Sequence, residues 1–595
     1  MKLKSIASIL IITFLSISTL ALSIMLYARY LYPDADYIQI ALTVMTLSPD
    51  VIKTNISLTD YILGLSFFII IWPLCYLFLT PSKQLIAAIL MGLGALYLTE
   101  WPEYMILSNT DTTLYEEYYV YPDSNITAPK SKRNLILIYL ESFEQNYTLA
   151  EHYNTNLIPH INALQTNNNH SEEYRSFRGV QYSIAALVAT HCGIPLFFLD
   201  NHDMYARTFF LPGAVCFPEI LKENNYQTEI IKAADIHFTD TDKFVLNHGY
   251  EKALGKDQIL AKYSEFSAPQ YQGTFNGLTD RALYEVAKKE LAEFSPDKPF
   301  FLTLFSLDTH IPGYHLDKAC ATPYHDIRDA YMCSDIAVND FISWLKTSPY
   351  WENTTVVILG DHPLPNRIKT KKHIKHKIFN VFLNLPDSKK IDNKKIFSAL
   401  DIPATLLESI NFNLKDHSYG LGRSIFTDVP SLLEKLGNNL NRHLLQHSEV
   451  YDKLSAPKHQ HIDKYVPYTL GETLDNQSSI RYTDVFEDVL GQYYLDRLNL
   501  EFPDTLPSTA TTFKVHIKFN GLFRPHGVLS IMANNTEVFS FKPEKGAVPP
   551  YTLDFTAPSK LVTDNKLQLK FHNSSDVRRI TTLGIAPLEI RITAE

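Results

Sequence analysis

The chain has 595 residues, a formal net charge of −10 and a hydrophobic fraction of 46%. This length is too great for a single hydrophobic core, so two or three folding units are expected. The acidic balance argues against a nucleic-acid partner, which would need clustered basic residues. Most of the long uncharged runs fall within the first hundred residues, a distribution typical of a membrane protein.

Three apolar runs at the amino end predict a transmembrane region over residues 1–105. The uncharged parts of these runs, 5–27, 61–80 and 85–98, are long enough to cross a bilayer as helices, the last when it is extended to Trp101. The expected helices cover about 5–27, 60–80 and 84–101. A cleaved signal peptide is the alternative for the first run, but it would explain only that run.

The charges beside these runs predict the orientation of the chain in the membrane. Lys2, Lys4 and Lys83 flank one side, and basic residues favour the cytoplasmic side. The amino terminus is then cytoplasmic, and everything after the third span lies outside the cytoplasm. The opposite side carries acidic residues, namely Asp34, Asp36, Glu100, Glu103 and Asp111.

The cysteines support an external location independently. Cys75 lies in an expected span, and the other four form two local groups, Cys192 with Cys216 and Cys320 with Cys333. Four cysteines allow three pairings, of which the sequential one closes the shortest loops. Disulfides of this kind fit an oxidising periplasm or cell exterior. Four unpaired buried thiols are the alternative.

The pattern of apolar and polar residues after the membrane region predicts an α/β domain followed by an all-β domain. Residues 106–133 form a polar, tyrosine-rich linker. Over 134–430, continuous apolar strands alternate with helical patterns, which favours a parallel sheet buried on both faces and hence an α/β/α domain. Residues 431–475 read as a helical connector. Over 476–595, short alternating strands with Pro, Asn and Gly turns predict a β-sandwich.

Three of the apolar strands end in ionisable residues. In an open parallel sheet, ligands bind beyond the carboxyl ends of the strands, so residues placed there converge although they are far apart in sequence. One ionisable residue at a strand end is weak evidence for a functional site. Three such strand ends on one sheet are much less likely to arise by chance. The strands end at Glu141, at Asp308 and His310, and at Asp361 and His362.

The residue types at these strand ends suit metal-assisted displacement at phosphorus or sulfur. Carboxylates, one imidazole and a hydroxyl together favour Mn²⁺ or Mg²⁺, with Zn²⁺ as an alternative. A metal ion would lower the pKa of the hydroxyl and neutralise phosphate charge. His310 is suited to protonate a leaving oxygen or to hold a phosphate oxygen. A structural bond from His310 to a loop carbonyl is the alternative.

The segment VQYSIAALVATHCGIP contains two hydroxyls that could be the nucleophile, Ser183 and Thr190. Ser183 immediately precedes the helix-forming IAALVA, where the positive end of the helix dipole stabilises an anionic phosphate or an alkoxide. Thr190 lies seven residues further on, roughly 10 Å along the helix axis, so both cannot occupy one site. We therefore favour Ser183, with a simple helix N-cap as its alternative role.

Several motifs together resemble the sulfatase-like transferases of the alkaline phosphatase superfamily. The chain carries LIYLES, YSIAALVATHCGIPL, THIP, GDH, GLGRS and LGIAPLEIRI. This set resembles lipoteichoic acid synthases, phosphoethanolamine transferases and, most of all, the phosphoglycerol transferases of osmoregulated periplasmic glucans. The resemblance extends over nearly the whole chain and implies an alkaline-phosphatase-like catalytic domain in the periplasm, anchored in a bacterial inner membrane.

The resemblance also implies roles for individual residues. Glu141, Asp361 and His362 match the metal ligands, Ser183 matches a nucleophile that is also a ligand, and His310 matches the histidine near the transferred group. The family nucleophile is usually threonine; serine offers the same hydroxyl with a less restricted χ1. Weaker candidates for headgroup contacts follow the GDHPLP segment, at Asn366 and Arg367.

The implied reaction moves sn-glycerol-1-phosphate from phosphatidylglycerol to sugar hydroxyls of periplasmic glucans through an ester on Ser183, with release of diacylglycerol. One alternative is transfer of phosphoethanolamine to lipid A or another glycan, with zinc. A second is a sulfatase or phosphodiesterase, although position 183 lacks the cysteine that is the usual formylglycine precursor. A third is a non-catalytic glycan-binding or assembly protein that keeps the fold.

Overall fold

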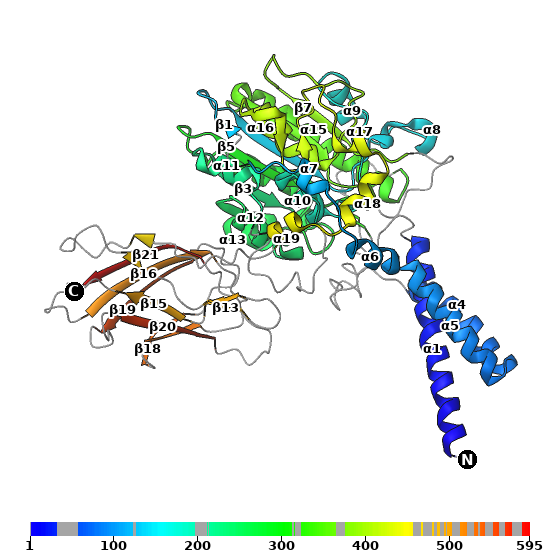
Figure 1. Cartoon of the computed structure of the whole chain (residues 1–595). Coiled ribbons are helices and arrows are strands. Elements are labelled where there is room, and N and C mark those ends of the chain that lie inside the picture. The colour runs from blue at the N-terminus through cyan, green and yellow to red at the C-terminus, as the bar shows by residue number, and fades with distance from the viewer. Residues whose placement is uncertain are drawn as a thin grey trace. The chain divides into compact units, whose positions relative to one another are not determined.

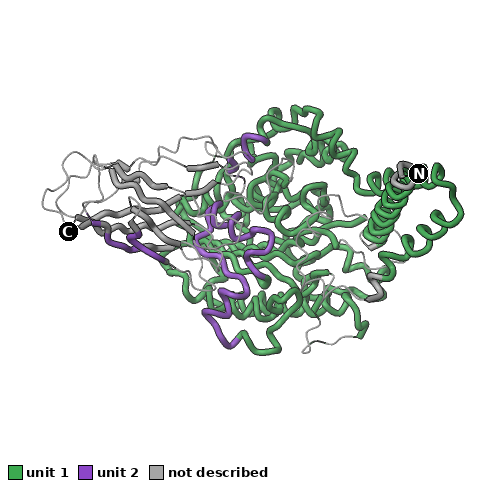
Figure 2. Tube along the Cα trace, turned by 90° about the horizontal axis from the view of Figure 1, so that it is seen from below, with its two compact units in different colours: residues 1–197, 215–234, 266–451 green, residues 198–214, 235–265, 452–595 purple. Residues whose placement is uncertain are grey.

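A computed structural model describes most of the amino-terminal three quarters of the chain and the strands of its carboxyl end (Figure 1). Two compact units are distinguished (Figure 2). The first comprises 1–197, 215–234 and 266–451, and the second comprises 198–214, 235–265 and 452–595. The described residues are 2–31, 58–122, 126–196, 211, 213–311, 314–315, 320, 323–364, 375–455 and, between 466 and 594, the strands named below.

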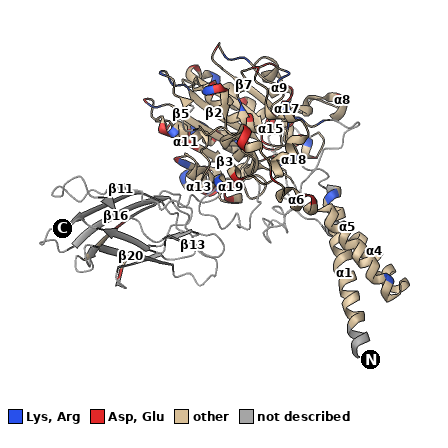
Figure 3. Cartoon of the chain, viewed as in Figure 1, with Lys and Arg blue, Asp and Glu red and all other residues tan. Residues whose placement is uncertain are grey.

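The amino end contains three helices, α1 (Lys2–Leu31), α4 (Leu58–Phe78) and α5 (Pro81–Leu98), and α1 contacts both of the others. Figure 3 shows few charged residues along them. Two of the helices, over Ala7–Tyr30 and Pro81–Leu98, are long and apolar enough to cross a membrane, whereas the apolar part of α4 is shorter. The apolar helices are therefore present where expected, and the crossing by all three stays a prediction.

The first unit is built on a mixed sheet with the strand order β3-β5-β2-β6-β7. The strands are β2 (Asn134–Leu140), β3 (Gln227–Lys232), β5 (Phe300–Phe305), β6 (Thr354–Gly360) and β7 (Asn380–Leu383). The first four in this order run parallel, and nearly all of their residues are buried, which explains the continuous apolar runs. The predicted α/β domain is confirmed, with one antiparallel addition at β7.

Helices pack around this sheet. The main ones are α9 (Pro159–Thr166), α10 (Ser183–Cys192), α14 (Asp280–Leu291), α15 (Ile327–Thr347) and α16 (Ile402–Ser409). Helix α10 packs against α16, while α14 packs against α15 and β5. Shorter elements of this unit are α6 (Trp101–Ser108), α7 (Leu114–Tyr118), β1 (Ile126–Thr127), α8 (Ala150–Tyr153), α11 (Phe217–Glu223), β8 (Asn413–Leu414), β9 (Ser418–Tyr419), β10 (Gly422–Arg423), α17 (Leu432–Leu436) and α18 (Asn439–Leu445).

Two disulfides form, and both join the sequential partners. Cys192 at the end of α10 bonds to Cys216 just before α11, and Cys320 bonds to Cys333 in α15. Cys75 in α4 is a free thiol. The sequential pairing is thus confirmed, and the alternative of four unpaired thiols is wrong.

The second unit contains α12 (Thr241–Asn247), β4 (Lys252–Leu254), α13 (Lys256–Lys262) and the strands of the carboxyl end; α19 (Glu449–Ser455) spans the boundary at residue 451 between the two units. Strands β15-β20-β17-β18 make one antiparallel sheet and β19-β16-β21 another. The rings of Phe539 and Phe555, one from each sheet, lie 5.5 Å apart. The β-sandwich stays a prediction.

The strands of the carboxyl end have the following bounds: β11 (Val466–Pro467), β12 (Ser479–Ile480), β13 (Val485–Glu487), β14 (Tyr493–Leu495), β15 (Arg497–Glu501), β16 (Thr512–Asn520), β17 (Leu529–Ala533), β18 (Thr536–Phe541), β19 (Tyr551–Pro558), β20 (Lys566–Asn573) and β21 (Ala586–Ala594).

Candidate active site

Two strand ends bring the predicted carboxylates together. In the parallel pair β2 and β6, Leu140 lies opposite Gly360, so the next residues, Glu141 and Asp361, leave the sheet side by side. With His362 they form a buried group whose ligand atoms all lie within 4.8 Å of one another. His362 Nε2 is 3.5 Å from Glu141 Oε1 and 3.3 Å from Asp361 Oδ2. The structure therefore unites three of the predicted ligands at one end of the sheet.

Ser183 faces this group from the start of α10. It is the first residue of the helix, whereas the N-cap position is occupied by Tyr182 and no side chain caps the helix end. The simple N-cap role is therefore wrong for Ser183. Its Oγ instead donates a hydrogen bond to Glu141 Oε2 at 3.2 Å and lies 3.4 Å from His362 Nε2. The hydroxyl joins the carboxylates and the imidazole, at the positive end of the helix dipole.

Thr190, the second hydroxyl of this helix, has a structural environment. Its Oγ1 donates to the carbonyl of Ala186 at 2.7 Å and lies 2.5 Å from the hydroxyl of Tyr139, and the residue is buried. Such bonds back to the preceding turn are common for threonine inside helices. As predicted, Thr190 belongs to the end of the helix and does not reach the cluster at its start.

Burial and the neighbouring charges shift the pKa values of all three residues of this group. Burial, with the adjacent charge of Glu141, raises the pKa of Asp361 to about 7. Burial also opposes ionisation of Glu141, but the charges of His310 and His362 lower its pKa. For His362, burial lowers the pKa, and the two carboxylates outweigh this and raise it. Asp361 Oδ2 is buried and accepts no hydrogen bond from any residue that the structure describes.

A divalent cation fits this donor set. The group offers hard carboxylate oxygens, one imidazole nitrogen and a hydroxyl, in a buried setting where two carboxylates repel each other. Asp361 Oδ2, which accepts no hydrogen bond from the described residues and lies 3.3 Å from His362 Nε2, has lone pairs that a metal would use. A bound cation would offset the repulsion between the two buried carboxylates.

Sequence reasoning missed the residue that joins the two strand ends. Ser142 adopts a left-handed backbone with φ 56°, an uncommon conformation outside glycine. Its amide donates to Asp361 Oδ1 at 2.7 Å, and its hydroxyl donates to Glu141 Oε1 at 2.8 Å. Strained residues of this kind occur where the surrounding structure demands them. The only signal in the sequence is a serine directly after the strand-ending glutamate.

Residues after β5 support Glu141 from the other side. Ser306 Oγ accepts a hydrogen bond from the Glu141 amide at 2.9 Å, and Thr309 Oγ1 donates to the Glu141 carbonyl at 2.5 Å. Both side chains are buried. Besides carrying His310, the SLDTH segment therefore holds the backbone of Glu141 through Ser306 and Thr309, which sequence reasoning did not anticipate.

His310 lies next to the group but outside the set of mutually close ligand atoms. Burial lowers the pKa of its imidazole, an effect that the charge of Glu141 only partly offsets. The ring of Phe275 packs edge-on against it, with the centroids 4.2 Å apart. A positive charge from Lys232, at the carboxyl end of β3, also lowers the pKa of His310. Lys232 is a buried cation that sequence reasoning passed over.

Asp308 does not join the cluster in the way that its strand end suggested. Its Oδ2 accepts a hydrogen bond from the amide of Asp280 at 2.9 Å, and Asp280 Oδ1 accepts from the amides of Leu307 and Asp308 at 2.7 and 3.1 Å. The two buried aspartates bind each other's backbone, so Asp308 fixes the loop that carries His310. Asn366 and Arg367 lie outside the described residues.

Gly360, the residue before Asp361, allows the two strand ends to approach closely. A Cβ at this position would overlap the carbonyl oxygen of Phe143 and lie 2.9 Å from Ile378 Cγ2. We expect Gly360→Ala to displace Asp361 and to lower the free energy of unfolding by about 1–3 kcal/mol or more, as overpacking does. Thermal melting of the purified protein measures this. Gly94→Ala in α5 is the control, since a Cβ there would make only ordinary contact with the side chain of Leu22, 3.5 Å away.

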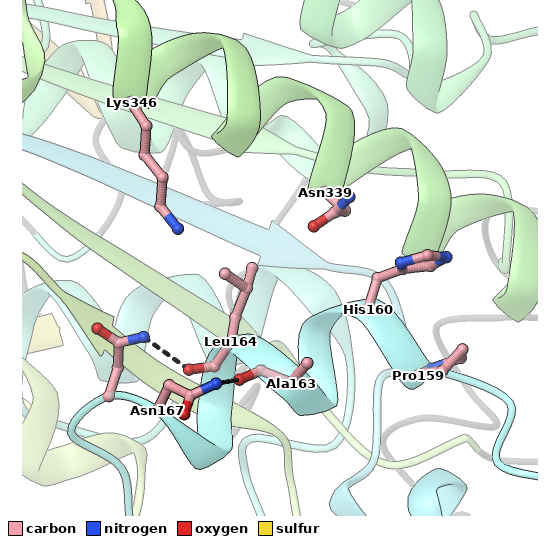
Figure 4. A pocket seen from close by; sticks show the side chains of 8 residues that line it. Pro159, His160, Ala163, Leu164, Asn167, Asn339 and Lys346 are labelled. Carbon is pink, nitrogen blue, oxygen red and sulfur yellow. Dashed lines mark hydrogen bonds between the residues drawn. The ribbon is translucent and has the colours of Figure 1, made fainter.

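A pocket lies apart from these residues, between α9 and α15 (Figure 4). Its volume is about 270 Å³. Amides, His160 and Lys346 line it, and none of the predicted site residues does.

Comparisons with known proteins found a family model and several relatives that match part of the chain. Residues 133–411 match the family model described as Sulfatase, and they include every residue of the cluster. The chain therefore contains a sulfatase-family domain.

Phosphoglycerol transferase I of Salmonella typhimurium is 30% identical over 317 residues, which cover 51% of this chain and 40% of that protein. The protein of the same name from Shigella flexneri is 29% identical over the same share. The chain thus spans about 40% of the length of these curated relatives.

Solved structures give similar matches at lower identity. An alkaline phosphatase superfamily protein from Vibrio parahaemolyticus is 20% identical, with a TM-score of 0.41, covering 55% of this chain and 77% of that one. The lipoteichoic acid synthase LtaP from Listeria monocytogenes is 20% identical, with a TM-score of 0.40, covering 49% and 75%.

Proposed function

We propose that the chain is a membrane-anchored transferase that moves sn-glycerol-1-phosphate from phosphatidylglycerol to sugar hydroxyls of periplasmic glucans. The observation that carries this proposal is the Ser183 hydroxyl, 3.2 Å from Glu141 Oε2 and 3.4 Å from His362 Nε2 at the start of a helix. A hydroxyl surrounded by carboxylates and an imidazole suits covalent catalysis at phosphorus. The curated relatives named phosphoglycerol transferase I support the choice of transferred group.

In the proposed first half-reaction, Ser183 Oγ bonds to the phosphorus of phosphatidylglycerol and the bond from phosphorus to the diacylglycerol oxygen breaks. The hydroxyl of Ser183 loses a proton and the departing oxygen gains one, so protons balance. We assign His310 to hold a phosphate oxygen and to pass a proton to the leaving oxygen. In the second half-reaction a sugar hydroxyl takes the phosphoglycerol group and Ser183 regains its proton.

We assign Glu141, Ser183, Asp361 and His362 as the ligands of one divalent metal ion, with Mn²⁺ or Mg²⁺ preferred and Zn²⁺ as the alternative. A bound ion would lower the pKa of the Ser183 hydroxyl and neutralise phosphate charge. Hydrogen bonds from Ser142 to the two carboxylates hold them in place for this role.

The proposed location is a bacterial inner membrane, crossed several times, with the sulfatase-family domain and the β-rich carboxyl end in the periplasm. Two apolar helices of sufficient length and two disulfides support this location. Partners would then be the lipid donor, a glucan acceptor and the membrane itself. The β-rich end is a candidate for holding the glucan.

The test supplies the purified full chain with vesicles containing phosphatidylglycerol labelled in its terminal glycerol, together with Mn²⁺. We expect a protein-bound label, diacylglycerol release, and transfer of the label to an added glucan. Phosphatidylethanolamine labelled in ethanolamine is run in parallel. Labelling only by ethanolamine would instead establish the phosphoethanolamine alternative, and release of free glycerol phosphate with no transfer would establish a hydrolase.

A further inference from the structure

Glu100 lies at the junction between the membrane helices and the rest of the first unit. It separates α5, which ends at Leu98, from α6, which begins at Trp101, and its backbone is left-handed with φ 60°. Its two carboxylate oxygens bind two different arginines. Arg29, near the end of α1, lies 3.1 Å from Oε1, and Arg178 lies 2.8 Å from Oε2.

Arg29 fixes the membrane side of this bridge. Besides its contact with Glu100, its Nε donates to the carbonyl of Leu98 at 2.8 Å, one of the otherwise unpaired carbonyls at the end of α5. The side chain of Arg29 is 15% exposed. The ends of α1 and α5 and the start of α6 are therefore joined through one guanidinium group and one carboxylate.

Arg178 fixes the other side, five residues before Ser183. Its amide donates to Asn441 Oδ1 in α18 at 2.9 Å. The segment that follows is also held, since the carbonyl of Gly179 accepts from the amide of Leu196 at 3.3 Å and Tyr182 is buried. A short, ordered stretch of chain thus leads from the bridge to the candidate nucleophile.

The helix beside the bridge carries an exposed apolar surface that continues that of α5. Trp101, Met105 and Ile106 of α6 are 38%, 39% and 68% exposed, and Tyr97 of α5 is 79% exposed. Tryptophan and tyrosine are enriched where a membrane meets water. The bridge therefore lies where the apolar helices give way to the interface.

We propose that the bridge formed by Arg29, Glu100 and Arg178 sets the height and orientation of the Ser183 segment above the lipid surface. Arg178 and Glu100 are then positioning residues for a lipid donor embedded in a bilayer, an inference that rests on the proposed function. One exposed ion pair contributes little. Here two guanidinium groups share one partly buried carboxylate, in a layer of lower dielectric than water, which strengthens both pairs.

The test compares one donor chemistry in two physical forms. The full chain, reconstituted with Mn²⁺, is given long-chain phosphatidylglycerol in vesicles or the dihexanoyl lipid as a dissolved monomer. We expect Arg178→Met and Glu100→Gln to lower transfer from vesicles about tenfold, since small misplacements of reacting groups cost this much or more. Transfer from the monomer should stay within about twofold of the parent, because a dissolved donor does not need the membrane distance.

Two further variants act as controls. Arg175→Met removes a nearby arginine whose hydrogen-bonded partner is Glu173, 2.8 Å from its Nε, and both donor forms should be used as by the parent. Arg178→Lys keeps the charge and should recover part of the vesicle activity. Equal loss on both donors, or no loss on either, overturns the inference while leaving the proposed function standing.

The result for the parent protein shows whether a failure concerns the proposed function or the inference about the bridge. If the parent uses phosphatidylethanolamine in place of phosphatidylglycerol, the proposed donor is wrong, and the same comparison with dihexanoyl and long-chain phosphatidylethanolamine decides the inference. If the parent uses neither lipid in either form, the proposed function and the inference both fail.

Discussion

Ser183→Ala is expected to abolish the protein-bound phosphoglycerol and to lower transfer from phosphatidylglycerol by at least about 10³-fold, as loss of a catalytic nucleophile does. The hydroxyl is the only part of the side chain that this change removes, and it is the group that donates to Glu141 and adjoins His362. Because Ser183 does not cap α10, alanine should leave the helix intact. Intact-mass spectrometry after incubation with the lipid and Mn²⁺ measures the adduct.

Two matched variants make this result specific. Thr190→Ser keeps the hydroxyl that bonds to the carbonyl of Ala186, so its adduct should match that of the parent. Ser183→Thr introduces the residue that the resembled family usually carries and should retain a measurable adduct, since the hydroxyl is kept. An adduct in Ser183→Ala, or its loss in Thr190→Ser at unchanged melting temperature, would overturn the assignment of the nucleophile.

The second large effect is expected for Asp361→Asn. This change should lower the transferase activity but raise the stability of the protein without metal. Transfer should fall by about 10²-fold or more, because one charged ligand of the proposed ion is lost. The chelated protein should instead become more stable at pH 8. Asp361 is buried next to Glu141, which is costly when both are ionised, whereas asparagine has no charge and keeps an oxygen for the amides of Ser142 and His362.

The pH dependence follows from the direction of the shift. The pKa of Asp361 is raised to about 7 in the folded protein, against about 3.9 in an unfolded chain. Between these values the folded state binds more protons at Asp361, so the contribution of this group to the stability of the chelated parent falls as pH rises from about 4 to about 7 and then levels off. The full loss is at most about 4 kcal/mol, at roughly 1.4 kcal/mol for each pH unit. Asp361→Asn should lack this contribution.

Thermal melting of chelated and Mn²⁺-loaded protein at pH 5 and pH 8 measures both effects. Metal should stabilise the parent by mass action and stabilise Asp361→Asn much less. Asp335→Asn is the control, because burial also raises the pKa of Asp335, to about 6, yet its carboxylate bonds to the amides of His160 and Ile161 and is not one of the clustered ligands. Equal metal stabilisation of Asp361→Asn and the parent would contradict the ligand assignment.

Local pattern was enough to predict much of this molecule. The apolar runs predict the amino-terminal helices, and the alternation of buried strands with helices predicts the parallel sheet. Short loops favour the sequential disulfides that form. Because parallel strands end at one edge of a sheet, Glu141, Asp361 and His362 are predicted to meet, and the structure brings them together.

The tertiary structure decided what local pattern does not specify. Asp308 ends a strand as Glu141 does, yet it bonds to Asp280, because the side-chain direction depends on which backbone amides are nearby. The left-handed backbone of Ser142 lies where two strand ends meet, and its amide bonds to Asp361 from the other strand. The pairing of Glu100 with Arg178 joins residues far apart in the chain. Periodicity and chain order determine which elements form and which ends of a sheet coincide, whereas hydrogen-bond partners and helix starts depend on packing between distant segments.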